Sequence, residues 1–141
     1  MALAKSGDPD FFPYKLTESL LTPSEVAFYV ALRLAAGQRY VVFPKVRLAD
    51  LCQGLDGWSD TAAFNRVSSK HVDFLLCDPE TFRPVLAVEL DDRSHLSARG
   101  RVRDGVKDDV FRTLGLGPYR QWVRHSYDPA ALARGIEDSL T

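Results

Sequence analysis

Two neighbouring β-type segments constrain this chain more than any other feature of its sequence. Residues 71–76 (HVDFLL) and 85–90 (VLAVEL) are short runs dominated by apolar residues with high strand propensity. The residues that join them, 77–84 (CDPETFRP), are dense in turn formers, which predicts an antiparallel hairpin. Because both segments are apolar on both faces, we expect the hairpin at the centre of a sheet.

A helix is expected shortly after the N-terminus. Thr22 is a predicted N-cap, Pro23 takes the first helical position, and Glu25 completes a capping box. We interpret Glu25 as a capping residue and not as part of a site. The predicted helix ends at Ala36, before Gly37, and its apolar series runs through Val26, Val30 and Leu34.

Further elements complete the expected order. Residues 40–46 (YVVFPKV) predict a strand that Pro44 places at a sheet edge or near its own end. Residues 53–65 are interpreted as a loop, and residues 119–123 (YRQWV) as a short strand. The order helix, three strands, helix, strand, helix predicts an α/β fold, a small mixed sheet flanked by helices.

The two later helices are predicted from periodicity and caps. The first covers residues 101–114 and carries an apolar stripe opposite a charged side. The stripe consists of Val102, Val106 and Val110, and the charged side of Arg101, Asp104, Lys107 and Asp108. The last helix begins after Asp128, with Pro129 at its first position and Leu132, Ile136 and Leu140 expected to face inward.

Length and composition bound the organisation of the chain. With 141 residues, 45% of them hydrophobic, we expect one domain over residues 15–141 after a flexible arm at 1–14. No apolar run is long enough for a bilayer or a signal peptide, so we expect a cytoplasmic protein without membrane contact. Cys52 and Cys77 are expected to be free thiols, Cys77 as a small buried apolar residue.

Carboxylates interrupt the two central strands where apolar residues are expected. Asp73 lies near the start of the first strand, and Glu89 and Asp91 lie near the end of the second. These ends are neighbours in a hairpin, and Glu89 and Asp91 share a face because strand side chains repeat every second residue. A buried carboxylate is costly unless it is compensated, and several convergent oxygens suit Mg²⁺ or Mn²⁺. Asp91 is alternatively a turn residue.

Charge is distributed unevenly although the net charge is only −1. Residues 66–92 contain three basic and six acidic residues, whereas residues 93–124 contain eight basic and three acidic ones. An acidic centre followed by a basic segment suits a metal site beside a phosphate-contacting surface. A solvated helix of mixed charge is the alternative interpretation.

The ordered motifs resemble the PD-(D/E)XK superfamily of restriction-endonuclease-like nucleases. The similarity runs from about Leu21 to Val123 and includes LTPSEVAFYVAL, YVVFPKVRLADL, SKHVDFLLCDPETFRPVLAVELDDRSH and RDGVKDDVFRTLGL. More closely, the chain resembles an uncharacterised bacterial domain family of that superfamily, related to very-short-patch repair endonucleases. The resemblance implies an αβββαβ core in which Asp73 and Glu89 bind the divalent ion.

The chain departs from the superfamily pattern at one important position. Asp91 stands two residues after Glu89, where the resemblance leads us to expect a lysine. Lys107 or Lys70 could supply the ammonium from elsewhere, and His95 could act as a general base. The remaining alternative is a domain that binds without cutting. Lys107 is also open to the simpler interpretation of a surface ion pair with Asp104.

The sequence therefore predicts a Mg²⁺- or Mn²⁺-dependent nuclease that acts on DNA, with RNA as an alternative substrate. Its expected catalytic residues are Asp73, Glu89, Asp91, His95 and Lys107, the first three as metal ligands. Its expected nucleic-acid contacts are Lys70, Arg99, Arg101 and Arg103. The rival hypotheses are a catalytically silent nucleic-acid-binding module and a protein-interaction module. The expected partners are a second copy of the chain or a larger repair or defence complex.

Overall fold

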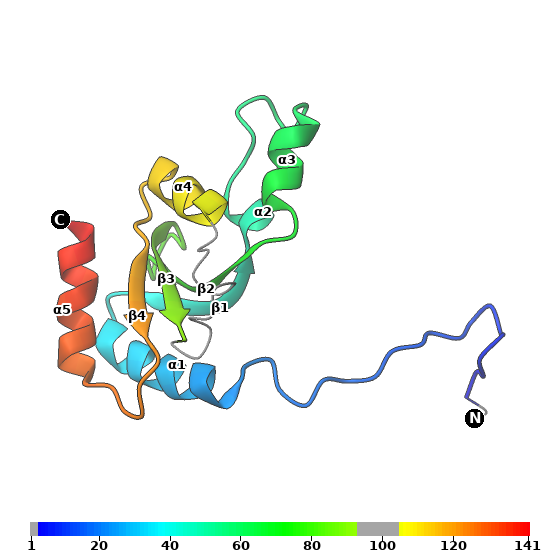
Figure 1. The fold of residues 1–141 in the computed structure, drawn as a ribbon, viewed down its shortest axis with the longest axis horizontal. Coiled ribbons are helices and arrows are strands. Elements are labelled where there is room, and N and C mark those ends of the chain that lie inside the picture. Colours follow the sequence, from blue (N-terminus) through cyan, green and yellow to red (C-terminus); the bar gives the residue numbers. More distant parts are fainter. Residues whose placement is uncertain (1–2, 93–104) are drawn as a thin grey trace.

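A four-stranded mixed sheet forms the centre of the protein, described here from a computed structural model. The structure describes residues 3–92 and 105–141 (Figure 1). The elements in chain order are α1 (Pro23–Ala36), β1 (Val41–Arg47), α2 (Leu48–Leu51), α3 (Thr61–Val67), β2 (His71–Cys77), β3 (Pro84–Asp91), α4 (Gly105–Thr113), β4 (Tyr119–Trp122) and α5 (Pro129–Leu140).

The strands follow the order β1-β2-β3-β4 across the sheet. β1 pairs with β2 and β2 with β3 in antiparallel fashion, whereas β3 and β4 are parallel. The central hairpin predicted from residues 71–90 is thereby confirmed. The edge position predicted for the strand containing Pro44 is confirmed too, because β1 borders the sheet.

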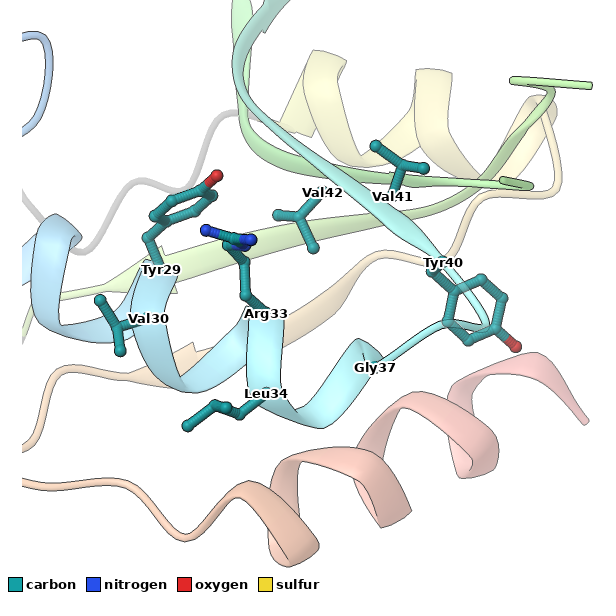
Figure 2. A pocket seen from close by; sticks show the side chains of 8 residues that line it. All are labelled: Tyr29, Val30, Arg33, Leu34, Gly37, Tyr40, Val41 and Val42. Atoms are coloured by element: carbon teal, nitrogen blue, oxygen red, sulfur yellow. The ribbon is translucent and has the colours of Figure 1, made fainter. Parts of the chain in front are cut away.

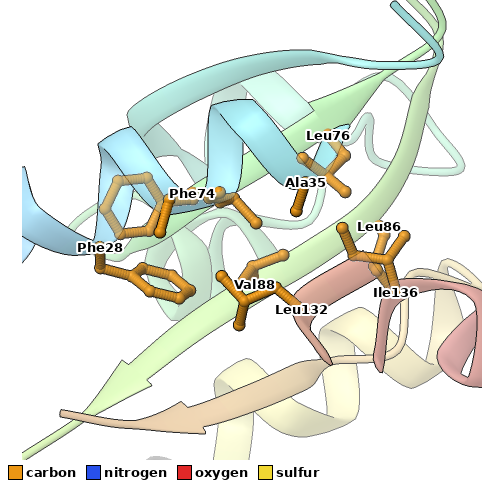
Figure 3. Close-up of a cluster of buried hydrophobic side chains, with 10 residues drawn as sticks. Phe28, Ala35, Phe74, Leu76, Leu86, Val88, Leu132 and Ile136 are labelled. Atoms are coloured by element: carbon orange, nitrogen blue, oxygen red, sulfur yellow. The ribbon is translucent and has the colours of Figure 1, made fainter. Parts of the chain in front are cut away.

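One face of the sheet is covered by α1 and α5. Side chains from these two helices and from β2 and β3 form the larger hydrophobic cluster (Figure 3). Phe28 of α1 meets Phe74 of β2 edge to face, with 5.3 Å between the ring centroids. Val88 of β3 and Ile136 of α5 are fully buried in the same cluster. This layer fixes β2 and β3, the strands that carry Asp73 and Glu89.

The opposite face of the sheet is covered by α2, α3 and α4. A second cluster joins Leu48 of α2, Val67 of α3 and Phe111 of α4 to the strand residues Leu75 and Ala87. Side chains alternate between the faces along a strand, so Leu75 and Ala87 mark the face toward α4. The fold is thus a layered α/β arrangement with helices on both sides of a small mixed sheet.

The capping predicted for α1 is confirmed, but its buried face differs from the predicted apolar series. Thr22 and Glu25 form both hydrogen bonds of the capping box. The exposed residues are Val26, Val30 and Leu34, and the buried residues are Phe28, Ala31, Leu32, Ala35 and Ala36. Because α1 is apolar almost all round, its periodicity could not select the face that meets the sheet.

Three further expectations about the helices were wrong. The region interpreted as a loop contains most of α3, whose N-cap Asp60 accepts a hydrogen bond from Ala63 N. In α5, Leu132 and Ile136 are buried as predicted, but Leu140 is 37% exposed at the helix end. In α4, Val110 packs against the core as predicted, but Val106 of the expected apolar stripe is 37% exposed and Asp108 of the expected charged side is buried. Residues 101–104 of the predicted helix lie outside the described residues.

The N-terminal segment runs away from the layered domain. Residues 3–22 contain neither helix nor strand and extend beyond the start of α1 (Figure 1). Both cysteines are free, as predicted, and Cys77 is buried. Within residues 3–92 and 105–141, no helix has the length and apolar character needed to cross a membrane.

Candidate functional site

The hairpin brings Asp73 and Glu89 together at one end of β2 and β3. Phe74 pairs with Val88 in the antiparallel register, so Asp73 and Glu89 occupy the next pair of positions along the strands. Asp73 Oδ2 accepts a hydrogen bond of 2.9 Å from Leu90 N. Asp73 N in turn donates to Glu89 Oε2 at 3.4 Å. The juxtaposition of the two acids expected from the sequence is present.

Both carboxylates point to the face of the sheet that α4 covers. Asp73 shares its face with Leu75, and Glu89 shares its face with Ala87, because each pair is two residues apart. Leu75 and Ala87 pack in the cluster that contains Phe111 of α4. The two carboxylates are therefore placed beneath α4 and away from α1 and α5.

Lys107 reaches the carboxylates from the first turn of α4. Its Nζ lies 2.6 Å from Glu89 Oε1, and the two side chains are only 19% and 4% exposed. No donor among the described residues makes a hydrogen bond of regular geometry with this oxygen, so the contact is an ion pair. The expectation that Lys107 can bring an ammonium group to the acidic strands therefore agrees with the geometry.

The environment of Glu89 favours its neutral form. Burial is the main cause, and the hydrogen bond and negative charge of Asp73 act in the same direction. Lys107 opposes both effects, yet the pKa of Glu89 rises to about 8. A single lysine thus compensates this buried carboxylate incompletely, and an additional cation beside it would favour the charged form.

Asp91 belongs to a neighbouring charged group centred on Arg120 of β4. Arg120 Nη1 lies 2.8 Å from Asp91 Oδ1, and its Nη2 contacts Asp108 Oδ1 of α4. Burial lowers the pKa of Arg120, but the hydrogen bond with Asp108 and the charges of Asp91, Asp108 and Glu89 outweigh burial and raise it. The influence of Glu89 shows that the two charged groups lie close together.

The expected three-carboxylate cluster does not assemble. Among residues 3–92 and 105–141, no group of three or more His, Cys, Asp or Glu side chains is arranged to hold a metal ion. Asp73 and Glu89 lie together, whereas Asp91 is directed to Arg120. Two carboxylates and one lysine are the chemical groups that the described part of the site offers.

The other predicted residues are placed as follows. Lys70 is half-buried just before β2, and its backbone carbonyl accepts a hydrogen bond of 2.9 Å from Leu48 N. The remaining predicted catalytic residue, His95, and the predicted phosphate contacts, Arg99, Arg101 and Arg103, lie outside the described residues.

Arg120 and Asp108 were not predicted as site residues. Arg120 interrupts the short strand segment YRQWV in the same way that Glu89 interrupts VLAVEL. Glu89 was predicted as a site residue because it is a charged residue within a strand segment, and the same criterion applies to Arg120. Asp108 offers no such signal, because a charge in an amphipathic helix is ordinarily solvated.

Two hollows in the surface lie apart from the carboxylates. One, of about 670 Å³, lies between α1 and the start of β1, and Tyr29, Arg33 and Tyr40 are among its lining residues (Figure 2). Another, of about 460 Å³, is lined by residues of α3 and α4 that include Trp58 and Val110. Neither is lined by a residue predicted for catalysis, so we place the candidate site at the carboxylates.

The fold and the site together define an α/β protein in which a buried glutamate and a half-buried aspartate lie side by side and a lysine faces the glutamate. Residues 17–140 match the family described as protein of unknown function (DUF2726), and the chain belongs to this family. The match covers every helix and strand of the domain and begins within the N-terminal segment. No curated protein and no solved structure matches the chain.

Proposed function

We propose that this protein is a divalent-metal-dependent nuclease acting on DNA, with Asp73 and Glu89 as ligands of Mg²⁺ or Mn²⁺. The observation that carries the proposal is the contact of Lys107 Nζ with Glu89 Oε1 at 2.6 Å, beside Asp73. A paired carboxylate site with an adjacent ammonium group suits a metal ion and a phosphate bound side by side. The resemblance to the PD-(D/E)XK superfamily points to the same chemistry.

The charge balance of the site supports a divalent cation. Asp73, Glu89, Asp91 and Asp108 carry four negative charges when ionised, whereas Lys107 and Arg120 carry two positive ones. When all six groups are ionised, their net charge is therefore −2, which one Mg²⁺ or Mn²⁺ ion would neutralise. Asp73 and Glu89 are the ligands that fit, because Arg120 already engages Asp91 and Asp108.

Each residue has a defined task in the proposed reaction. A bound Mg²⁺ or Mn²⁺ would supply an activated water and neutralise charge on the scissile phosphate. Glu89 and Asp73 provide oxygens on adjacent rigid strands, and the Leu90 N–H holds the Asp73 carboxylate in place. Lys107 provides a positive charge for the phosphate oxygens, the task that the superfamily lysine would have had at position 91.

The partners of the nuclease belong to the same proposal. Lys70, Arg99, Arg101 and Arg103 are proposed phosphate contacts, and His95 is a proposed general base. RNA is the alternative substrate. Cleavage of both strands of a duplex would be served by a homodimer, and a repair or defence complex is the alternative assembly. We propose a cytoplasmic location.

A second candidate function is nucleic-acid binding without cleavage. The ion pair between Lys107 and Glu89 favours it, because Lys107 compensates part of the Glu89 charge without a metal. Such a module would show salt-dependent binding to DNA and no cleavage in any divalent metal.

Cleavage assays with matched variants test the proposal. Wild type, Glu89→Gln and Lys107→Met are incubated with supercoiled, linear and single-stranded DNA in Mg²⁺ or Mn²⁺. Removing one group that stabilises a transition state commonly costs about 100-fold or more in rate, and we expect that loss in both variants. Glu137→Gln is the control, because Glu137 lies at an exposed position of α5, where it pairs with Arg39.

The results separate the alternatives. Cleavage by wild type and Glu137→Gln, lost in Glu89→Gln, supports the nuclease. Equal cleavage by wild type and Glu89→Gln places the activity elsewhere or in a contaminant. Absence of cleavage together with salt-dependent DNA binding supports the second candidate.

A further inference from the structure

Two consecutive residues of α4 contact two residues that are register partners in the sheet. Glu89 of β3 pairs with Arg120 of β4 in the parallel register. Lys107 contacts Glu89, and Asp108, the next residue of α4, contacts Arg120. A positive residue of α4 thus contacts a negative residue of the sheet, and the next, negative residue of α4 contacts a positive residue of the sheet. Because the two contacts lie on adjacent helix positions, a rotation of α4 that broke one of them would also displace Lys107.

Arg120 is the group that joins three elements. Its side chain is 20% exposed and bridges Asp91 of β3 to Asp108 of α4. The planar guanidinium can bind two carboxylates at once in a fixed geometry, which a lysine ammonium on a flexible chain does not reproduce. Partly buried pairs of this kind are screened by salt much less than exposed pairs.

The hydrophobic contacts of α4 with this side of the sheet come from the second half of the helix. Phe111 lies four residues after Lys107 on the same helical face and is fully buried in the cluster on this side of the sheet. Together with the partly buried Val110, it anchors the helix about one turn away from the charged site. The contact between Asp108 and Arg120 supplies a second fixed point, and two points define the orientation of a short helix.

We propose that Arg120 is a positioning residue that, through Asp108, fixes the first turn of α4 so that Lys107 lies against Glu89. The contacts stand by themselves, and only the catalytic consequence rests on the proposed nuclease function. Arg120 itself touches neither metal nor phosphate in this proposal. Its loss displaces Lys107 and leaves the carboxylate pair of Asp73 and Glu89 in place.

The accessibility of the Lys107 amine tests the proposal directly. Metal-free protein is treated briefly with an amine-acylating reagent, and modification of each lysine is measured by peptide mass spectrometry. Lys45 is the internal reference, because its side chain is 49% exposed whereas that of Lys107 is 19% exposed. In Arg120→Met we expect Lys107 modification to rise at least about twofold relative to Lys45, which corresponds to the low end of coupling between contacting residues, about 0.5 kcal/mol.

Arg112→Met is the matched control. Arg112 lies on the same helix and pairs with Asp109 of that helix at an exposed position, and within residues 3–92 and 105–141 it has no ion pair with the sheet. We expect Lys107 modification in this variant to equal that of wild type. Arg120→Lys, which keeps the charge but not the two-pronged geometry, is expected to give an intermediate rate.

The outcomes are distinct from those of the cleavage assay. Folded Arg120→Met with wild-type modification of Lys107 would overturn the proposal. If Arg120→Met does not fold, Asp108→Asn provides the same comparison, because it breaks only the contact to α4. Increased modification in a protein that never cleaves DNA would support the positioning role and count against the nuclease.

Discussion

Lys107 Nζ and Glu89 Oε1 lie 2.6 Å apart, which joins the first turn of α4 to the third strand of the sheet. Lys107 belongs to the helix that lies in sequence between the parallel strands β3 and β4, and both side chains are largely withdrawn from solvent. The alternative interpretation, a solvated helix of mixed charge, does not hold for Lys107, whose side chain is 19% exposed. The contact has consequences for stability that can be measured without any substrate.

The ion pair should appear as a coupling energy in a double-mutant cycle. Lys107→Met leaves Glu89 buried without its cation, and we expect it to destabilise the protein when Glu89 is ionised. In a Glu89→Gln background the same change should cost less, with a coupling of about 0.5–3 kcal/mol. Urea unfolding of the four proteins at about pH 9 measures it. Additive effects of the two substitutions would contradict a direct contact.

Glu89 should make the stability of the metal-free protein fall with rising pH. Its pKa is about 8 in the folded protein and has the ordinary value of 4.5 in the unfolded chain. Between these values the folded state binds more protons, so this contribution is complete below pH 4.5 and is lost as pH rises through about 8. Glu89→Gln should show a flatter dependence. Urea unfolding in EDTA across this range measures both proteins, and parallel curves would show that Glu89 titrates normally.

Divalent metal should stabilise the folded protein through Asp73 and Glu89. A ligand at about 100 times its dissociation constant adds roughly 2.7 kcal/mol to the free energy of unfolding. We therefore expect Mn²⁺ to raise the melting temperature of wild type, EDTA to reverse the effect, and Asp73→Asn and Glu89→Gln to abolish it. Glu137→Gln should respond like wild type. A shift of the same size in all four proteins would place the metal elsewhere.

The buried face of α1 can be tested with two leucines that lie two residues apart. Leu32 is fully buried, and Leu34 is 67% exposed. Leu32→Ala should destabilise the protein by about 2–5 kcal/mol, because it removes packed atoms from the core. Leu34→Ala should change the stability by no more than about 0.5 kcal/mol. Chemical denaturation measures both, and a larger effect of Leu34→Ala than of Leu32→Ala would contradict the burial of the Leu32 face.

The hairpin and the helix caps were predictable because their signals are local. The turn-rich residues 77–84 lie between two apolar runs, and antiparallel pairing across so short a connection leaves few alternative registers. That pairing alone brings Asp73 near Glu89. The same reasoning failed for α3, because a helix of 7 residues is too short to show a clear periodic pattern.

The central strands, the carboxylates within them and the N-caps of α1 and α5 could be predicted from local sequence, since each depends on residues close together along the chain. Tertiary structure decided which side of α1 is buried, that Lys107 meets Glu89, and that Arg120 binds Asp91 and Asp108. These outcomes depend on the parallel pairing of β4 with β3 and on where α4 crosses the sheet. Periodicity can show that a helix has two faces, but only the packing of distant segments selects the face and the partners that bury it.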